Sequence, residues 1–346
     1  MAYIMKIFAA FGELMLRLSP PGRETLLQSP RLVATFGGAE ANVAVSLARF
    51  GHEVRYVSVI PANEIGEAAV RELRGAGVAT DFILRKGRRL GIYFAETGAN
   101  QRPSKVLYDR DHAAIAEARP EDIDWGRVFA GVEAFHITGI TPALSATAAE
   151  LAREAVRAAR AKNLQVSVDL NFRAKLWRYG QSAPEVMPDI IKLADLIVAN
   201  EEDLQKALGF EAAAAPGSGR LDVAQYEALT ARVMKAYPNL TRLAVTLRES
   251  HGADWNDWSA VVRTTSEFLA GPRYEIRAIV DRIGTGDAFT AGWLHGLDVF
   301  GDDRKALAFA VAAGCLKHSY PGDFNPATEK DVLALMGGEA SGRVQR

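Results

Sequence analysis

Regular alternation of β-strand and α-helix patterns over the middle of the chain most restricts the folds that it can adopt. Apolar strand-like runs at 132–137, 164–169 and 195–199 alternate with helical segments, among which the Ala-rich stretch 145–161 is the longest. Strands that are separated by helices normally pair in parallel, and a parallel sheet needs helices on both faces. The pattern therefore predicts an α/β fold with a central, mainly parallel sheet.

Two segments nearer the N-terminus depart from this alternation. Residues 14–35 and 81–111 contain short extended stretches that are separated by polar turns and by Pro and Gly. Short strands bounded by such turn residues predict a small antiparallel sheet apart from the main one. We interpret this second sheet as a lid over a site.

The remaining organisation of the chain is simple. We predict a single domain over 1–337, a flexible tail at 338–346, and a low-complexity linker or surface loop at 212–221. The apolar start at 3–11 predicts a first strand rather than a signal peptide. The sequence contains no uninterrupted apolar run of the length that a membrane-spanning helix needs. We therefore expect a cytoplasmic protein without a membrane partner.

Charge and cysteine content exclude two functional classes. Among 346 residues, 41 Lys and Arg oppose 42 Asp and Glu. A nucleic-acid-binding protein usually carries a basic excess, so we expect no nucleic-acid partner. The single cysteine, Cys315, permits neither a disulfide within the chain nor a metal site made of cysteines.

The strongest chemical signal is the segment 281–289 (DRIGTGDAF), which follows a predicted strand at 274–280 and opens a predicted helix. Gly284, Thr285 and Gly286 can direct backbone N–H groups toward one point at the N-terminus of that helix. The partial positive charge of a helix N-terminus adds to these groups. The segment therefore predicts an anion cradle for charge on a transferred phosphoryl group.

Asp287, in the first turn of the same helix, has two interpretations. A carboxylate beside a phosphate cradle can act as the general base that takes a proton from the attacking hydroxyl. Asp in a first turn is also a common helix cap. A dinucleotide-binding turn fits less well, because Phe289 stands where a third glycine is needed. The residues alone leave the catalytic and the capping roles of Asp287 both open.

Two glycine motifs together resemble a known family. The Gly-Asp-Ala-Phe at 286–289 resembles the signature of the ribokinase-like (PfkB) carbohydrate kinases, and Gly-Gly-Ala-Glu-Ala-Asn-Val-Ala at 37–44 resembles that family's first glycine motif. The resemblance extends from Glu13 to about Asp323. It implies a ribokinase-like fold with a β-sheet lid, ATP and Mg²⁺ as cofactors, and Asp287 as the catalytic base.

The resemblance also implies candidate metal contacts. The family often has Asn-x-x-Glu near its Mg²⁺ ion, whereas this chain has Asp203 three residues after Asn200. The shorter carboxylate implies contact with the metal through water. The alternative role of Asn200 is an N-cap of the following helix. A monovalent cation near the anion hole is a further expectation by analogy.

Nucleotide contacts are expected at Asn200, Thr246 and Arg248, besides Gly284 and Gly286 of the cradle. The chain departs from the family here, because Thr-Leu-Arg-Glu-Ser at 246–250 replaces the usual glycine-rich turn. Ala312 and Cys315 have a spacing that could line a slot for adenine. A small apolar helix face in the core explains these last two residues equally well.

The sugar end of the site is predicted from cations and aromatic residues. Tyr108 and Arg110 share one face of a predicted lid strand, and Arg173 follows the strand at 164–169. Arginine binds carboxylates through two parallel hydrogen bonds, so two arginines favour an anionic substrate. The alternative for each arginine is a solvated surface charge. Further sugar contacts are expected from Gly38, Asn42, Tyr93 and Asp323.

Local matches narrow the resemblance to one branch. Tyr-Asp-Arg at 108–110, the segment 138–145 and Asp-Leu-Asn-Phe-Arg-Ala-Lys-Leu-Trp at 169–177 are similar to 2-keto-3-deoxygluconate kinases. The resemblance implies phosphorylation of the terminal hydroxyl of this sugar acid, and lid strands that pair between subunits of a homo-oligomer. A fructokinase or ribokinase is the first alternative. A non-catalytic, sugar-binding regulatory protein is the second, although the intact Gly-x-Gly-Asp opposes it.

Overall fold

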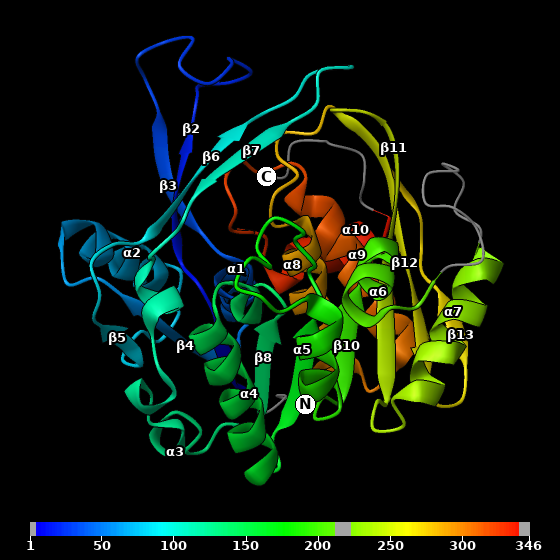
Figure 1. The fold of residues 1–346 in the computed structure, drawn as a ribbon. Coiled ribbons are helices and arrows are strands. Elements are labelled where there is room, and N and C mark those ends of the chain that lie inside the picture. The colour runs from blue at the N-terminus through cyan, green and yellow to red at the C-terminus, as the bar shows by residue number, and fades with distance from the viewer. Residues whose placement is uncertain (1–4, 212–222, 339–346) are drawn as a thin grey trace.

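The computed structural model describes residues 5–211 and 223–338 as a large sheet between two layers of helices, with a smaller sheet above it (Figure 1). The predicted linker at 212–221 and nearly all of the predicted tail lie outside the described residues. None of the described helices is long and apolar enough to cross a bilayer. The predicted α/β architecture is confirmed.

The main sheet has ten strands, seven of which run in parallel. They follow the order β11-β10-β9-β8-β1-β4-β5, and the antiparallel β12, β13 and β14 complete the sheet beyond β11. The parallel strands carry continuous runs of buried residues, as expected for a sheet that is covered on both faces. The strands are β1 (Ile7–Phe11), β4 (Glu53–Ile60), β5 (Ile83–Arg85), β8 (Ala134–Thr138), β9 (Gln165–Asp169), β10 (Leu196–Ala199), β11 (Arg242–Gly252), β12 (Trp255–Thr264), β13 (Phe268–Ala270) and β14 (Tyr274–Arg277).

Two hydrophobic clusters correspond to the two faces of this sheet. One cluster joins the sheet to the helices drawn in green in the foreground of Figure 1. The other joins the sheet to the N-terminal and C-terminal helices. Small alanines on one stripe of α4 let it pack closely on the sheet, and the Ser145 hydroxyl caps its N-terminus. The first layer comprises α3 (Trp125–Val128), α4 (Ala146–Ala161), α5 (Ala183–Ile191), α6 (Glu201–Leu208) and α7 (Val223–Ala236); the second comprises α1 (Ala39–Arg49), α2 (Glu64–Gly75), α8 (Thr285–Phe300), α9 (Asp303–Lys317) and α10 (Glu329–Met336).

The lid is a separate four-stranded sheet of order β3-β2-β6-β7, which projects above the main sheet (Figure 1). The prediction of an entirely antiparallel lid is wrong, because β2 and β6 are parallel. After β3 the chain leaves the lid and forms α1, β4, α2 and β5 in the main body. It then returns to the lid as β6, which runs in the same direction as β2. The lid strands are β2 (Met15–Ser19), β3 (Val33–Gly37), β6 (Gly91–Glu96) and β7 (Lys105–Asp109).

The end of one strand differs from the sequence prediction, and two other elements are irregular. The hairpin of β11 and β12 has a bulge near Gly252 that bends it. Strand β14 ends at Arg277 and does not reach Val280, because Ala278 adopts a φ angle of 55°. Helix α5 contains Pro188 in its interior.

Candidate active site

A cavity of about 730 Å³ lies between the lid and the carboxyl ends of strands β9, β10 and β11. Open α/β sheets bind ligands at this edge. The cavity brings together most of the side chains that the sequence predicts to form a site. These predicted residues are Gly38, Asn42, Tyr93, Tyr108, Arg173, Asn200, Asp203, Thr246, Arg248, Gly284, Thr285, Gly286, Asp287 and Asp323.

The predicted anion cradle forms the N-terminus of α8. Gly284 is the N-cap of this helix with a φ angle of 83°, and a Cβ atom there would collide with the backbone oxygen of Asp323. A Cβ atom on Gly286 would instead meet open space, so the backbone of Gly286 borders the cavity directly. The first N–H groups of α8 are therefore accessible to an anionic ligand.

Asp287 lies at the inner end of the cavity and is only 8% exposed. The side-chain amide of Asn42 donates a hydrogen bond to its Oδ2 at 2.7 Å, and Asn42 itself accepts one from the backbone N–H of Gly38. Burial raises the pKa of Asp287 to about 7, against the opposing effect of the Asn42 amide. A carboxyl group with this pKa can accept a proton near neutral pH.

An ion-pair network joins the lid to the cradle. Arg17, on lid strand β2, donates to Asp281 at 2.6 Å and to Asp323 at 2.8 Å, and the Tyr93 hydroxyl also donates to Asp323. Burial alone would lower the pKa of Arg17, but the two carboxylates raise it overall. Asp281 also accepts from the backbone N–H of Ile283, so the network holds the turn that precedes the cradle.

Three arginines give the cavity a positive wall. Arg173, Arg248 and Arg282 all line it. Burial lowers the pKa of Arg248, and the positive charge of Arg173 lowers it further. Burial also lowers the pKa of Arg282, and the positive charge of Arg248 adds to this effect. Arg173 forms no ion pair with the carboxylates that the structure describes. The wall is therefore suited to phosphate or carboxylate ligands.

Three carboxylates, Asp169, Asp203 and Asp287, line the same cavity. Burial raises the pKa of Asp169 well above its usual value, and Asp203 and Asp287 raise it further. Burial also raises the pKa of Asp203, to about 6. Asn200 and Asp203 cap each other's backbone N–H groups at α6, and Asp203 also accepts from the N–H of Phe172 at 2.9 Å. Carboxylates that repel one another in a cavity are compatible with a divalent cation, and Asp169 and Asp203 are the candidate ligands.

Comparison with known proteins fits this geometry. Residues 5–330 match the model of the pfkB family carbohydrate kinases. The chain belongs to this family. The 2-dehydro-3-deoxygalactonokinase of Haloferax volcanii is 32% identical to this PfkB kinase, over 95% of this chain and 96% of that relative.

Solved structures give the same result for the fold. A 2-dehydro-3-deoxygluconokinase of Thermotoga maritima superposes with a TM-score of 0.91 at 42% identity, covering 97% of this chain and 99% of that one. A putative 2-keto-3-deoxygluconate kinase of Enterococcus faecalis gives a TM-score of 0.88 at 31% identity, covering 99% of each chain. The predicted ribokinase-like fold with a separate small sheet is thereby confirmed.

Three predicted contacts lie outside the cavity of this PfkB kinase. Arg110 is buried, forms an ion pair with Glu13, and stacks its guanidinium 5.1 Å from the Tyr108 ring centre. Ala312 is fully buried in the core face of α9, and Cys315 packs against the same core. Burial raises the pKa of the Cys315 thiol to about 12. The geometry therefore differs from the prediction for Arg110 and matches the core alternative for Ala312 and Cys315.

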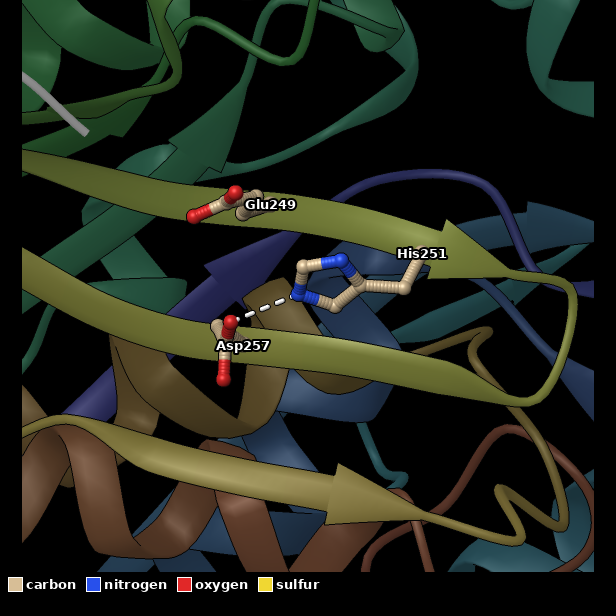
Figure 2. Close-up of side chains that lie close together, drawn as sticks. All are labelled: Glu249, His251 and Asp257. Atoms are coloured by element: carbon tan, nitrogen blue, oxygen red, sulfur yellow. Dashed lines mark hydrogen bonds and ion pairs between the residues drawn. The ribbon is translucent and has the colours of Figure 1, made fainter. Parts of the chain in front are cut away.

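A second group of potential metal ligands lies on the hairpin of β11 and β12, away from the cavity. Figure 2 shows the His251 ring on β11 directed at Asp257 on β12, with Glu249 nearby on β11. Nε2 of His251 lies 2.7 Å from Oδ2 of Asp257. Arg273 donates to the same oxygen at 2.6 Å and lies 3.4 Å from Glu249. The arginine already supplies the positive charge, so this group is an ion-pair cluster and carries no metal assignment.

Sequence reasoning missed Arg17, Asp169, Asp281 and Arg282, all of which are part of the site or of its support. Strand alternation places Arg17 on the same face as Met15, but the sequence does not show that this face points toward the site. Asp169 and Asp281 lie in the segments 169–177 and 281–289, but neither was assigned a role at the site from the sequence. Nothing local marks the pairing of Arg17 with Asp281, which is 264 residues away.

Proposed function

We propose that this PfkB kinase transfers the γ-phosphoryl group of ATP to the terminal hydroxyl of a 2-keto-3-deoxy sugar acid, with 2-keto-3-deoxygluconate as the preferred substrate. One observation carries the proposal: a single cavity joins a glycine cradle and a buried base to Arg173, which has no ion-pair partner among the described residues. The names of the similar proteins, which include gluconate-type and galactonate-type kinases, support the same substrate class.

In the proposed reaction, Asp287 accepts the proton of the attacking hydroxyl, and the hydroxyl oxygen forms a bond to the γ-phosphorus. The bond from that phosphorus to the β-phosphate oxygen breaks, and ADP leaves. Asn42 fixes the orientation of the base through its 2.7 Å hydrogen bond. The backbone N–H groups of Gly284, Thr285 and Gly286 stabilise the group in transfer. Asp169 and Asp203 would hold a Mg²⁺ ion, which would supply positive charge against the phosphates.

An ADP-release assay with Mg-ATP tests this function. It compares 2-keto-3-deoxygluconate, 2-keto-3-deoxygalactonate, fructose, ribose and a control without sugar. We expect turnover with the sugar acids and at most background turnover with the neutral sugars. Activity on fructose or ribose alone would overturn the sugar-acid proposal and favour the fructokinase or ribokinase alternative. No activity on any of them would favour the regulatory alternative.

Arg173→Ala is expected to raise the KM for the sugar acid about 10- to 100-fold, with a smaller change in kcat. A hydrogen bond to a charged group contributes about 1.5–3 kcal/mol, and Arg173 is exposed in the cavity without another ion pair among the described residues. Arg178→Ala, at an exposed site nearby that does not line the cavity, is the matched control. An unchanged KM in Arg173→Ala would remove the proposed contact with the carboxylate.

We also propose that the lid strands pair between subunits of a homo-oligomer. The strand registers place Arg17, Tyr93 and Tyr108 on the face toward the cavity. The opposite face has an apolar part that is only partly buried and carries Leu107 at 59% exposure, and Asp109 shares this face. An apolar sheet face of this kind is typical of a contact between proteins. Its other members are Leu16, Leu18, Ile92 and Phe94.

Leu107→Glu is expected to lower the molar mass in solution to that of a smaller assembly, because it places a charge in the proposed contact. Light scattering coupled to gel filtration measures this mass. Leu333→Glu is the control, since Leu333 is an exposed leucine on α10, far from the lid in sequence. A wild-type protein that is monomeric at high concentration would contradict the oligomer.

Three further expectations remain predictions. We propose that residues 1–337 act as one kinase domain and that the protein works in the cytoplasm. We also retain the prediction of a monovalent cation near the cradle. Comparing activity in potassium chloride with that in tetramethylammonium chloride tests the last of these, because the larger cation cannot enter a small site.

A further inference from the structure

Lys317, the last residue of α9, has a fully buried side chain. Lysine is almost never buried completely unless it is paired. Its Nζ donates to the backbone oxygen of Tyr320 at 3.1 Å, and the structure records no carboxylate of the described residues within ion-pair distance of it. A buried ammonium with so few direct partners is costly, so its position needs a reason.

The position of Lys317 is directly behind the cradle. Its Cε atom lies 3.4 Å from the place where a Cβ atom on Gly284 would stand. It does not line the cavity, which borders the other side of the same turn. The backbone of Gly284 to Gly286 therefore separates the ammonium from any ligand in the cradle.

The pKa of the Lys317 amine is lower than usual, and three carboxylates limit that change. Burial lowers the pKa of the amine, but the carboxylates of Asp281, Asp323 and Asp287 act in the opposite direction, while Arg17 adds to the lowering. These groups come from the cradle turn, the turn after α9, α8 and the lid. A leucine or methionine would fill the same space without the desolvation cost of a charge. Packing alone does not explain a lysine at this position.

We propose that Lys317 is a positioning residue whose buried ammonium supplies a fixed positive charge behind the Gly284–Gly286 cradle and stabilises the phosphoryl group during transfer. Electrostatic interactions are strong in a site that excludes water, and a fixed charge needs no rearrangement during the reaction. The charge acts through one layer of backbone, on a group that occupies the cradle only in transit. The effect therefore falls on kcat more than on KM. The inference rests on the proposed function for its kinetic test.

Lys317→Met tests the proposal, since methionine is a similarly long side chain without charge. We expect kcat to fall about 10- to 100-fold with less than about a threefold change in the KM for ATP. Ammonium or methylammonium ions should restore part of the lost kcat. Lys305→Met, at an exposed lysine of the same helix, should behave as wild type. A Lys317→Met enzyme within about threefold of the wild-type kcat would overturn the proposal.

A binding measurement separates the charge from a purely structural role and from the choice of substrate. Calorimetry compares Mg-ADP alone with Mg-ADP plus aluminium fluoride, which mimics the phosphoryl group in transfer. We expect Lys317→Met to leave ADP affinity nearly unchanged and to weaken the fluoride-dependent complex at least tenfold. Equal loss of both affinities, with a lower thermal midpoint, would show a structural role only. If the wild type phosphorylates no sugar, the proposed function fails, and this measurement still decides the role of Lys317.

Discussion

Asp287→Asn is expected to retain the fold and to lose about 10²–10⁴ in kcat, the usual contribution of a general base. Asparagine keeps the size of the side chain and can still accept the hydrogen bond from Asn42, which is 2.7 Å long in the wild type. It cannot take the proton of the attacking hydroxyl. Steady-state ADP release with the sugar acid measures the loss. Turnover of the variant within a few-fold of wild type would show that another group is the base.

The pH dependence gives an independent check on the same residue. Burial raises the pKa of Asp287 to about 7, and the base must be deprotonated to act. The wild-type kcat should therefore rise as the pH increases through about 7, and the residual activity of Asp287→Asn should lack this rise. A wild-type profile that is flat across this range would contradict the assignment.

Stability should change in the opposite direction from activity. The folded-state pKa of Asp287 lies above the ordinary value of 3.8, so the folded protein binds this proton more tightly than the unfolded chain. The stability that results is present below 3.8 and is lost as the pH rises toward about 7. Asparagine stays neutral, so at pH 8 the thermal midpoint of the variant should equal or exceed that of wild type. A much lower midpoint would mean that the loss of activity reflects unfolding.

Gly284→Ala is expected to lower kcat about 10²–10³-fold, the effect of losing a donor that stabilises negative charge in the reaction. The φ angle of 83° is unfavourable for alanine, and the added Cβ would collide with the backbone oxygen of Asp323. The turn must therefore move, and the N–H groups at the start of α8 move with it. Kinetics with saturating ATP and sugar acid measure the effect.

Gly301→Ala is the matched control for backbone strain. Gly301 ends the same helix with a φ angle of 58°, and a Cβ atom there would meet no neighbour within 4 Å. Both variants should lose stability from the positive φ angle, about 1–2 kcal/mol. Only Gly284→Ala should also lower kcat. If both variants retain kcat, the cradle does not depend on the geometry of Gly284.

The parts of the site that could be predicted from sequence are those coded within a short segment. Gly284, Gly286 and Asp287 stand next to one another, so the turn and the helix start were visible as one pattern. Alternating strands and helices gave the main sheet in the same way. Ala278 shows the limit of prediction from a short segment, because alanine rarely adopts a φ angle of 55° and its presence does not predict one. This φ angle ends the preceding strand earlier than predicted.

Long-range pairing explains the remaining differences. The partner of Arg110 is Glu13, which is 97 residues away, and the paired guanidinium does not line the cavity. Arg17 and Asp323, which are 306 residues apart, were visible only as separate charged residues. Helix α10 was not predicted either, since only one of its side chains is fully buried and its periodicity is weak.

The Arg17 network has a consequence for the timing of events at the site. Since Arg17 belongs to the lid and Asp281 to the turn before the cradle, the lid cannot shift without breaking two buried ion pairs or pulling that turn along. Arrival of the sugar under the lid and final alignment of the phosphate-binding turn are then mechanically one event.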